Sequence, residues 1–171
     1  MSDAMDIDTL DDSPPIRFRT ILGDFIDFLA DELDERGDAD SIARFARYRA
    51  AIDYADSHDV IRYFVKHSWT HWDRIIAKDW HHYETTWNAK ISANMQGRIA
   101  PLVDALFRAL ADDDFEDCMW EHLHALIRCS VHCIHEGFAE QPSELSLTPL
   151  VEQLSIDLRL DHGRAYDKAF D

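Results

Sequence analysis

The stretch Ser13–Gly37, SPPIRFRTILGDFIDFLADELDERG, sets the fold class. It begins with Ser13-Pro14-Pro15, which is typical of a helix start, because the hydroxyl can cap a free amide and a first-turn proline needs no amide partner. Apolar residues then fall on one side at about 100° per residue. They are Ile21, Leu22, Phe25, Ile26, Phe28, Leu29 and Leu33. Gly37 is a natural helix stop, so the sequence predicts an amphipathic α-helix that ends near it.

Similar patterns predict further helices along the chain. A second helix is expected from about residue 40 to Ala55, and the run Asp56–Asp59 is expected to cap a third. The apolar spacing of the third segment continues from Val60 to Tyr83. A single helix extending beyond that point would be too long for a chain of this size. We therefore expect a break near Asp79–Thr86.

The second half of the chain predicts three more helices. Pro101 opens the first, the second runs from about Phe115 to Glu136 and stops at Gly137, and Thr148-Pro149 starts the last. Only five glycines punctuate the chain, and no alternating segment indicates a strand. The sequence therefore predicts an all-α, single-domain bundle of six or seven helices without a β-sheet.

Length and composition are consistent with one such domain. The 171 residues are 46% hydrophobic and 30% charged, which is enough apolar material for a core. The helical domain is expected at residues 14–161, between an acidic flexible tail at 1–13 and a polar tail at 162–171. No apolar run reaches the roughly 18 residues of a membrane span, and the acidic start lacks a secretory pattern. Three cysteines in this context indicate reduced thiols and a cytoplasmic or nuclear location.

Charge is distributed unevenly along the chain. There are 34 acidic and 17 basic residues, for a formal net charge of −17. Residues 1–40 carry a net charge of −10, residues 41–108 carry +3 and residues 109–171 carry −10. Such acidity disfavours duplex nucleic acid and anionic membranes and favours basic proteins or metal cations. The alternative is that the charge only keeps the protein soluble.

Two acidic rows form the candidate partner surface. One side of the first helix carries Asp24, Asp27, Asp31 and Asp34, and the second row consists of Asp112, Asp113, Asp114, Glu116 and Asp117. The chain has no Gly-x-Ser-x-Gly elbow, phosphate loop or dinucleotide fingerprint, which favours a non-enzymatic role. We therefore expect an acidic helical interaction or structural module that binds a basic protein. Solvated helix faces and acids that favour a helix dipole are the alternative explanation of both rows.

A transition-metal site is an alternative function. His67 and His71 are four residues apart on one flank of the third helix, and Cys129 and Cys133 are four apart on the fifth. If those helices were neighbours, the four side chains would complete a tetrahedral Cys₂His₂ zinc set. Buried cysteines that fill apolar space and half-exposed packing histidines are the simpler explanation. On the fifth helix, His124 is expected on the solvated side.

Basic and aromatic residues alternate in the middle segment, which suggests a nucleic-acid binder as a second alternative. The residues are Arg44, Arg47, Arg49, Arg62, Lys66, Arg74 and Lys78, with Trp69, Trp72, Trp80 and Trp87. Most of these tryptophans fall on the apolar stripe, so core packing explains them better, and the arginines can pair with the acidic first helix. An exposed tryptophan face in this segment would indicate a homo-oligomer.

Asp79 falls near the middle of the apolar stripe formed by Trp72, Ile75, Ile76 and Tyr83. A buried, unpaired carboxylate is costly or shifts its pKa, so the sequence predicts a partner for it. An arginine of another helix, or free amides at the predicted break, would serve. A structural role is favoured over a catalytic one.

The run Phe25-x-x-Phe28-Leu29, followed by Tyr63-Phe64, Trp72, Ile75 and Lys78-Asp79, resembles short helical proteins of unassigned role in large eukaryotic DNA viruses. The resemblance covers about residues 20–84 and carries no catalytic signature, so it transfers no site residues. It implies a helical fold and a location in the virion or the infected cell.

Overall fold

The computed structural model describes residues 13–35, 39–79, 81 and 112–158. Every regular element within these residues is a helix and none is a strand, which confirms the all-α prediction. The elements are α2 (Pro14–Glu35), α3 (Ala39–Tyr54), α4 (Ser57–Ser68), the 3₁₀ turn η1 (Trp69–His71), α5 (Trp72–Ile76), α8 (Asp113–His135) and α9 (Leu147–Gln153). The helix predicted from Pro101 and the tail predicted at 162–171 lie outside the described residues, as does all of the N-terminal tail except Ser13. The predicted total of six or seven helices depends on these segments and stays a prediction.

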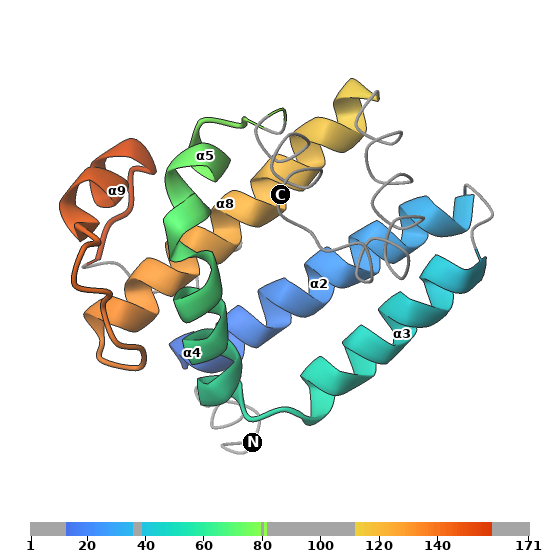
Figure 1. The fold of residues 1–171 in the computed structure, drawn as a ribbon, viewed down its shortest axis with the longest axis horizontal. Helices are drawn as coiled ribbons and strands as arrows, with labels where there is room; N and C mark the ends of the chain where they lie inside the picture. The colour runs from blue at the N-terminus through green and yellow to red at the C-terminus, as the bar shows by residue number, and fades with distance from the viewer. Residues whose placement is uncertain (1–12, 36–38, 80, 82–111, 159–171) are drawn as a thin grey trace, which may run out of the picture.

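Helix α8 is the central element of the bundle (Figure 1). Its second half is buried around almost the whole helix, because Ala125, Leu126, Ile127, Cys129 and Val131 are all at most 1% exposed. A helix that is apolar on every side must be covered on every side. Helices α2, α4, α5 and α9 all contact α8 and provide that cover.

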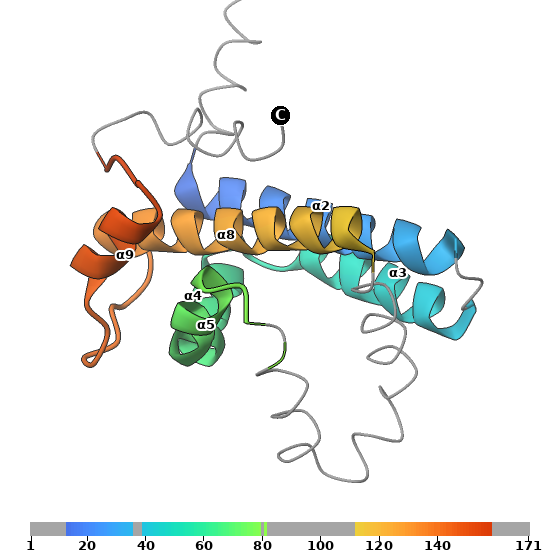
Figure 2. The ribbon, with the colours of Figure 1, turned by 90° about the horizontal axis from the view of Figure 1, so that it is seen from above.

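Helix α2 packs antiparallel to α8. At one end the Cys129 thiol donates to the Pro14 carbonyl over 3.5 Å, and at the other the rings of Phe28 and Phe115 stack with centroids 5.1 Å apart. Helix α3 runs back along α2, and the Arg19 guanidinium donates to the Ala55 carbonyl over 3.0 Å. Figures 1 and 2 show α2 beside both α8 and α3, with α4 and α5 crossing α8.

Most of the predicted helix boundaries are confirmed. The Asp56 side chain caps α4 by accepting from the amides of His58 and Asp59 over 2.9 and 3.2 Å. Gly137 follows α8 with φ +85°, a conformation that costs glycine little. The predicted Thr148 start is wrong by two residues, because α9 begins at Leu147 after Ser146.

The long third segment breaks earlier than predicted. Helix α4 stops at Ser68, whose hydroxyl donates to the Phe64 carbonyl over 2.5 Å and accepts from the Trp72 indole over 2.9 Å. These bonds span the 3₁₀ turn η1. Trp72, the residue that follows the turn, lies in the core and is 1% exposed. Helix α5 then ends at Ile76, and Lys78 adopts φ +58°. Most of the predicted break at 79–86 lies outside the described residues.

Two side chains of α8 hold the ends of neighbouring helices. The Nε2 atom of His124 lies 3.0 Å from the Ile75 carbonyl at the end of α5. One turn later, the Arg128 guanidinium donates to the Leu154 and Ser155 carbonyls at the end of α9. The prediction of a solvated His124 is therefore wrong, because α5 packs on that side of α8 and leaves the imidazole half-buried.

None of the helices in the described part of the chain has the length and hydropathy needed to cross a bilayer.

The central position of α8 predicts a large effect of truncating Ile127, which is 0% exposed. We expect Ile127→Ala to lower the free energy of unfolding by about 2–5 kcal/mol, because the substitution leaves a cavity between packed helices. Urea denaturation followed by circular dichroism measures this. Tyr54→Ala, at a side chain that is 92% exposed, is the control and should change stability by less than about 0.5 kcal/mol. Equal effects would contradict the central role of α8.

Candidate functional site

The acidic row on α2 divides into paired and unpaired carboxylates. Arg49 of α3 donates to Asp27 over 3.1 Å and to Asp53 over 2.6 Å. Its guanidinium lies against Gly23, where a Cβ atom would come within 2.5 Å of the nearest nitrogen. Asp27 is therefore part of the α2–α3 contact, as the alternative of internal arginine pairing predicted. It is not a free partner-binding group.

Asp24 is exposed on the same side of α2. Partial burial, and then the negative charge of Asp27, raise the pKa of its carboxyl group, while Arg49 acts in the opposite direction. The α2–α3 ion pair of Asp27 and Arg49 thus influences the pKa of Asp24. The exposed residues Asp31 and Asp34 make no ion pair within the described part of the chain.

The row at the start of α8 also divides into two groups. The Asp112 carboxylate caps the helix by accepting from the amides of Asp114 and Phe115 over 2.9 and 3.3 Å. The Glu116 carboxylate accepts from the Trp120 indole over 3.2 Å. These two residues have local structural roles. The remaining three, Asp113, Asp114 and Asp117, are exposed.

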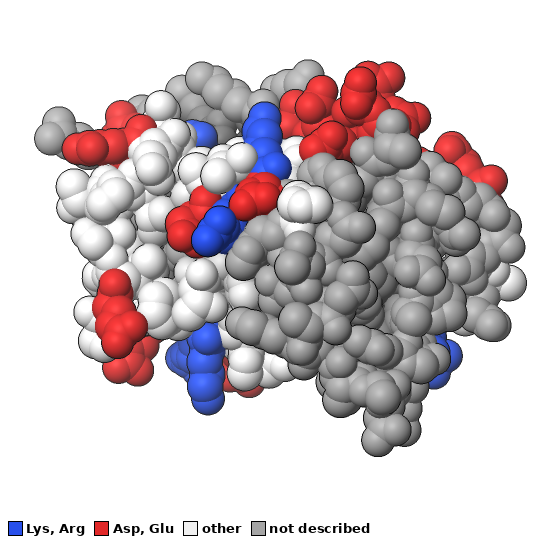
Figure 3. Space-filling model, turned by 45° about the horizontal axis from the view of Figure 1, so that its top comes forward, with Lys and Arg blue, Asp and Glu red and all other residues white. Residues whose placement is uncertain are grey.

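The unpaired acids of the two rows lie on the same side of the molecule, because α2 ends where the antiparallel α8 begins. We call this the acidic surface. It consists of Asp31, Asp34 and Glu35 of α2 and Asp113, Asp114, Asp117 and Glu121 of α8. Figure 3 shows acidic side chains gathered on this side. Sequence reasoning missed Glu35 and Glu121, although each lies four residues after a predicted acid and so on the same helix face.

Cys118 is an exposed thiol next to these acids. Burial raises the pKa of the thiol, and Glu121, Asp114 and Asp117 raise it further by destabilising the thiolate. Cys129 and Cys133 are both 0% exposed. A thiol reagent therefore has one accessible target on the folded protein, and that target lies within the acidic surface.

The structure does not bring the predicted zinc ligands together. His67 is exposed on α4 and packs against Tyr63 with ring centroids 4.2 Å apart, while Cys129 and Cys133 lie in the core against α2. His71 belongs to η1, so the helix that would align it with His67 is interrupted. Within the described residues no group of three or more His, Cys, Asp or Glu side chains could hold a metal ion. The cysteines act as apolar fillers.

Some of the basic and aromatic residues of the middle segment make contacts within the fold. Trp72 is buried and Trp69 packs against the core, so the core-packing explanation is confirmed for both. Trp80 and Trp87 lie outside the described residues. Arg49 and Arg62 form ion pairs with acids of the same chain. No exposed tryptophan face supports self-association in the part that the structure describes.

Asp79 is not the buried carboxylate that the sequence predicted. Its side chain is 35% exposed, and the Arg74 guanidinium lies 3.2 Å from Oδ2. This arginine belongs to α5, the short helix that ends just before Asp79. The physical reason is that α5 ends at Ile76 and Lys78 turns the chain, which takes Asp79 off the apolar stripe.

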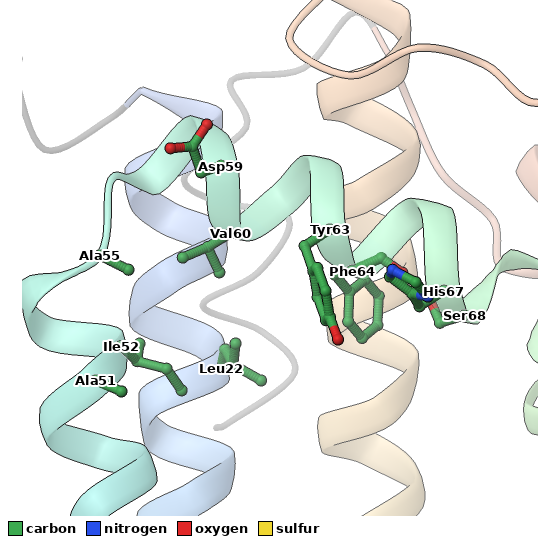
Figure 4. A pocket seen from close by; sticks show the side chains of 10 residues that line it. All are labelled: Leu22, Ala51, Ile52, Ala55, Asp59, Val60, Tyr63, Phe64, His67 and Ser68. Atoms are coloured by element: carbon green, nitrogen blue, oxygen red, sulfur yellow. The ribbon is translucent and has the colours of Figure 1, made fainter.

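An apolar groove between α2, α3 and α4 was not predicted. Leu22, Ile52, Val60, Tyr63 and Phe64 are among its lining residues, and its cavity volume is ≈ 540 Å³ (Figure 4). Tyr63 is 68% exposed on one wall. The groove needs three helices in contact, which periodicity within a single helix does not reveal.

The capping role of Asp112 predicts a measurable loss when its side chain is removed. We expect Asp112→Ala to lower the free energy of unfolding by about 1 kcal/mol, while Asp112→Asn should retain most of the stability because asparagine also caps helices. Asp113→Asn is the matched control at an exposed neighbour. Thermal or urea denaturation distinguishes the three variants, and equal stability of Asp112→Ala and wild type would exclude the capping role.

Two half-buried histidines of α8 predict acid sensitivity. Burial lowers the pKa of His122, which packs between Phe25 and Phe28, and also that of His124. The unfolded imidazole takes up a proton near its ordinary pKa of 6.5, whereas the folded one resists protonation. Both histidines therefore contribute full stability above about pH 6.5 and lose it as the pH falls below that value.

Urea midpoints at about pH 7.5 and about pH 5.5 test this expectation, in a range where exposed carboxylates stay ionised. The midpoint should be lower at the acidic pH, and the double variant His122→Gln/His124→Gln should reduce the difference. His135→Gln, at an exposed position of the same helix, should not reduce it. An unchanged pH dependence in the double variant would assign the effect to other groups.

No protein-family model, curated protein sequence or solved structure matches this chain. The candidate site therefore depends on the chain's own geometry.

Proposed function

We propose that this protein is a non-enzymatic helical module that binds a basic protein partner through the acidic surface. The observation that carries the proposal is the set of acids in the last turns of α2. Asp31, Asp34 and Glu35 are exposed there, and the last turn of the helix contains no basic residue. Arg36, which follows in the sequence, lies outside the described residues.

Carboxylates at this position work against the helix. The C-terminal end of a helix carries a partial negative charge, so each exposed acid there costs about 0.3–1 kcal/mol at low salt. The acids at the start of α8 differ, because the partial positive charge at a helix N-terminus stabilises Asp113 and Asp114. Helix stability thus explains Asp113 and Asp114 but not the acids of α2. A cationic partner would offset the cost at α2.

The acidic surface suits a basic partner for a second reason. Like charges concentrated on one side of a protein accelerate the encounter with a surface of opposite charge, and this effect weakens with salt. Within the described residues, the last turn of α2 contains no basic residue that would compete with the partner. The complex is therefore expected to form at low ionic strength and to dissociate at high ionic strength.

The alternatives have less support in the geometry. The zinc proposal lacks a group of converging ligands among the described residues. For the nucleic-acid proposal, two of its candidate residues make internal contacts, because Arg49 pairs with Asp27 and Trp72 is buried in the core. A location in a virion or infected cell stays a prediction from the sequence resemblance.

Charge reversal on α2 provides the test. We expect Asp31→Lys/Asp34→Lys to abolish a salt-sensitive complex in a pull-down from the source cell, read by quantitative mass spectrometry. The same change should leave the protein as stable as wild type or slightly more stable, because lysine suits the end of a helix. Loss of binding then cannot be attributed to unfolding, which circular dichroism confirms.

Glu144→Lys/Glu152→Lys is the matched control, since it reverses two exposed acids elsewhere and changes the net charge equally. It should retain the partner. A photo-crosslinker on Cys118, attached at mildly alkaline pH because of the raised thiol pKa, should capture the same basic protein. Equal loss in both double variants, or binding that persists in Asp31→Lys/Asp34→Lys, would overturn the assignment of this surface.

A further inference from the structure

A cleft lies on the side of α4 away from the apolar groove. Arg62, Val65 and Lys66 of α4 line one wall together with Trp69 of η1, at the spacing of one helix face. The loop of residues 140–143, which follows α8, forms the other wall. The cavity volume is ≈ 590 Å³, within the range of about 300–1,000 Å³ typical of small-molecule sites.

The loop wall is held in place by its own hydrogen bonds. The Leu145 amide donates to the Pro142 carbonyl over 3.0 Å, and the Gln141 side-chain amide donates to the Leu145 carbonyl over 2.7 Å. Ala139, just before the loop, is buried in the core. The cleft is therefore formed before any ligand enters, which lowers the entropic cost of binding.

The lining combines three chemical features. Arg62 is exposed and pairs with the exposed Asp59 at 3.4 Å, and Lys66 is exposed with no ion pair within the described residues. Trp69 is half-buried and packs on the core beneath the cleft, next to the buried Val65. Glu140 is an exposed carboxylate on the opposite wall. Gln141 and Ser143 add polar groups on the same wall, so the cleft offers two cations, an aromatic surface and several hydrogen-bond acceptors.

We propose that this cleft binds a small ligand in which an anionic group is joined to a flat aromatic ring, as in a nucleoside monophosphate. The guanidinium of Arg62 and the ammonium of Lys66 would hold the anion. The indole of Trp69 would stack on the ring, and Glu140 would accept from a hydroxyl or amino group. The site is separate from the acidic surface, and its test is independent of the proposed function.

The net charge of −17 opposes the approach of any anion, so the ionic strength of the test matters. At about 0.15 M salt the screening length is about 8 Å, which suppresses the distant carboxylates more than direct contacts in the cleft. The full chain is titrated with adenosine monophosphate under this condition and followed by ¹H–¹⁵N NMR. The Trp69→Phe variant identifies the Trp69 indole resonance. Inorganic phosphate and adenosine are titrated separately, and benzoate distinguishes a carboxylate from a phosphate ligand.

Adenosine monophosphate or benzoate is expected to shift the Trp69 indole resonance, and the monophosphate should bind more tightly than phosphate or adenosine alone. Arg62→Gln/Lys66→Gln should weaken this binding by at least about tenfold, because hydrogen bonds to charged groups are the strong ones. Arg47→Gln, an exposed cation on α3, should leave it unchanged. No shift with either ligand, or shifts that Arg62→Gln/Lys66→Gln does not reduce, would overturn the proposal.

Discussion

The burial of the second half of α8 on all sides is the constraint on which the rest of the structure depends. A helix with apolar residues around its whole circumference is stable in water only when other elements enclose it. In this protein α2, α4, α5 and α9 do so. Two polar side chains of α8 connect it to these neighbours, since His124 and Arg128 contact the terminal carbonyls of α5 and α9. The first turns of α8 stay accessible and carry exposed acids, while the exposed His135 marks its other end.

The same arrangement separates structural carboxylates from available ones. Asp112 caps α8, Glu116 binds the Trp120 indole, and Asp27 pairs with Arg49, so each is explained by a local contact. The acids at the end of α2 have no such explanation, because the helix dipole opposes them. An acidic row in a sequence therefore contains both structural carboxylates and carboxylates that are available to a partner. The contacts of each carboxylate in the structure distinguish the two kinds.

Helix α4 carries two candidate binding faces with different chemistry. One borders the apolar groove with Tyr63 and Phe64, and the other borders the cleft with Arg62, Lys66 and Trp69. The 3₁₀ turn after Ser68 separates α4 from α5, so that Trp72 enters the core while Trp69 stays half-exposed at the cleft. The sequence pattern alone predicted a continuous helix through this region, with its break only near Asp79–Thr86.

The sequence by itself determined the helical class, the amphipathic stripe of α2, the cap at Asp56 and the stop at Gly137, because these depend on residues close together in the chain. It also determined the excess of negative charge at both ends. Only the tertiary structure decided that Asp27 is paired, that Asp79 leaves the apolar stripe and that His67 does not meet Cys129. It also decided that the end of α2 and the start of α8 lie on the same side of the molecule. Each of these outcomes depends on which helices are neighbours or where a helix turns, and periodicity along one helix carries no information about its neighbours.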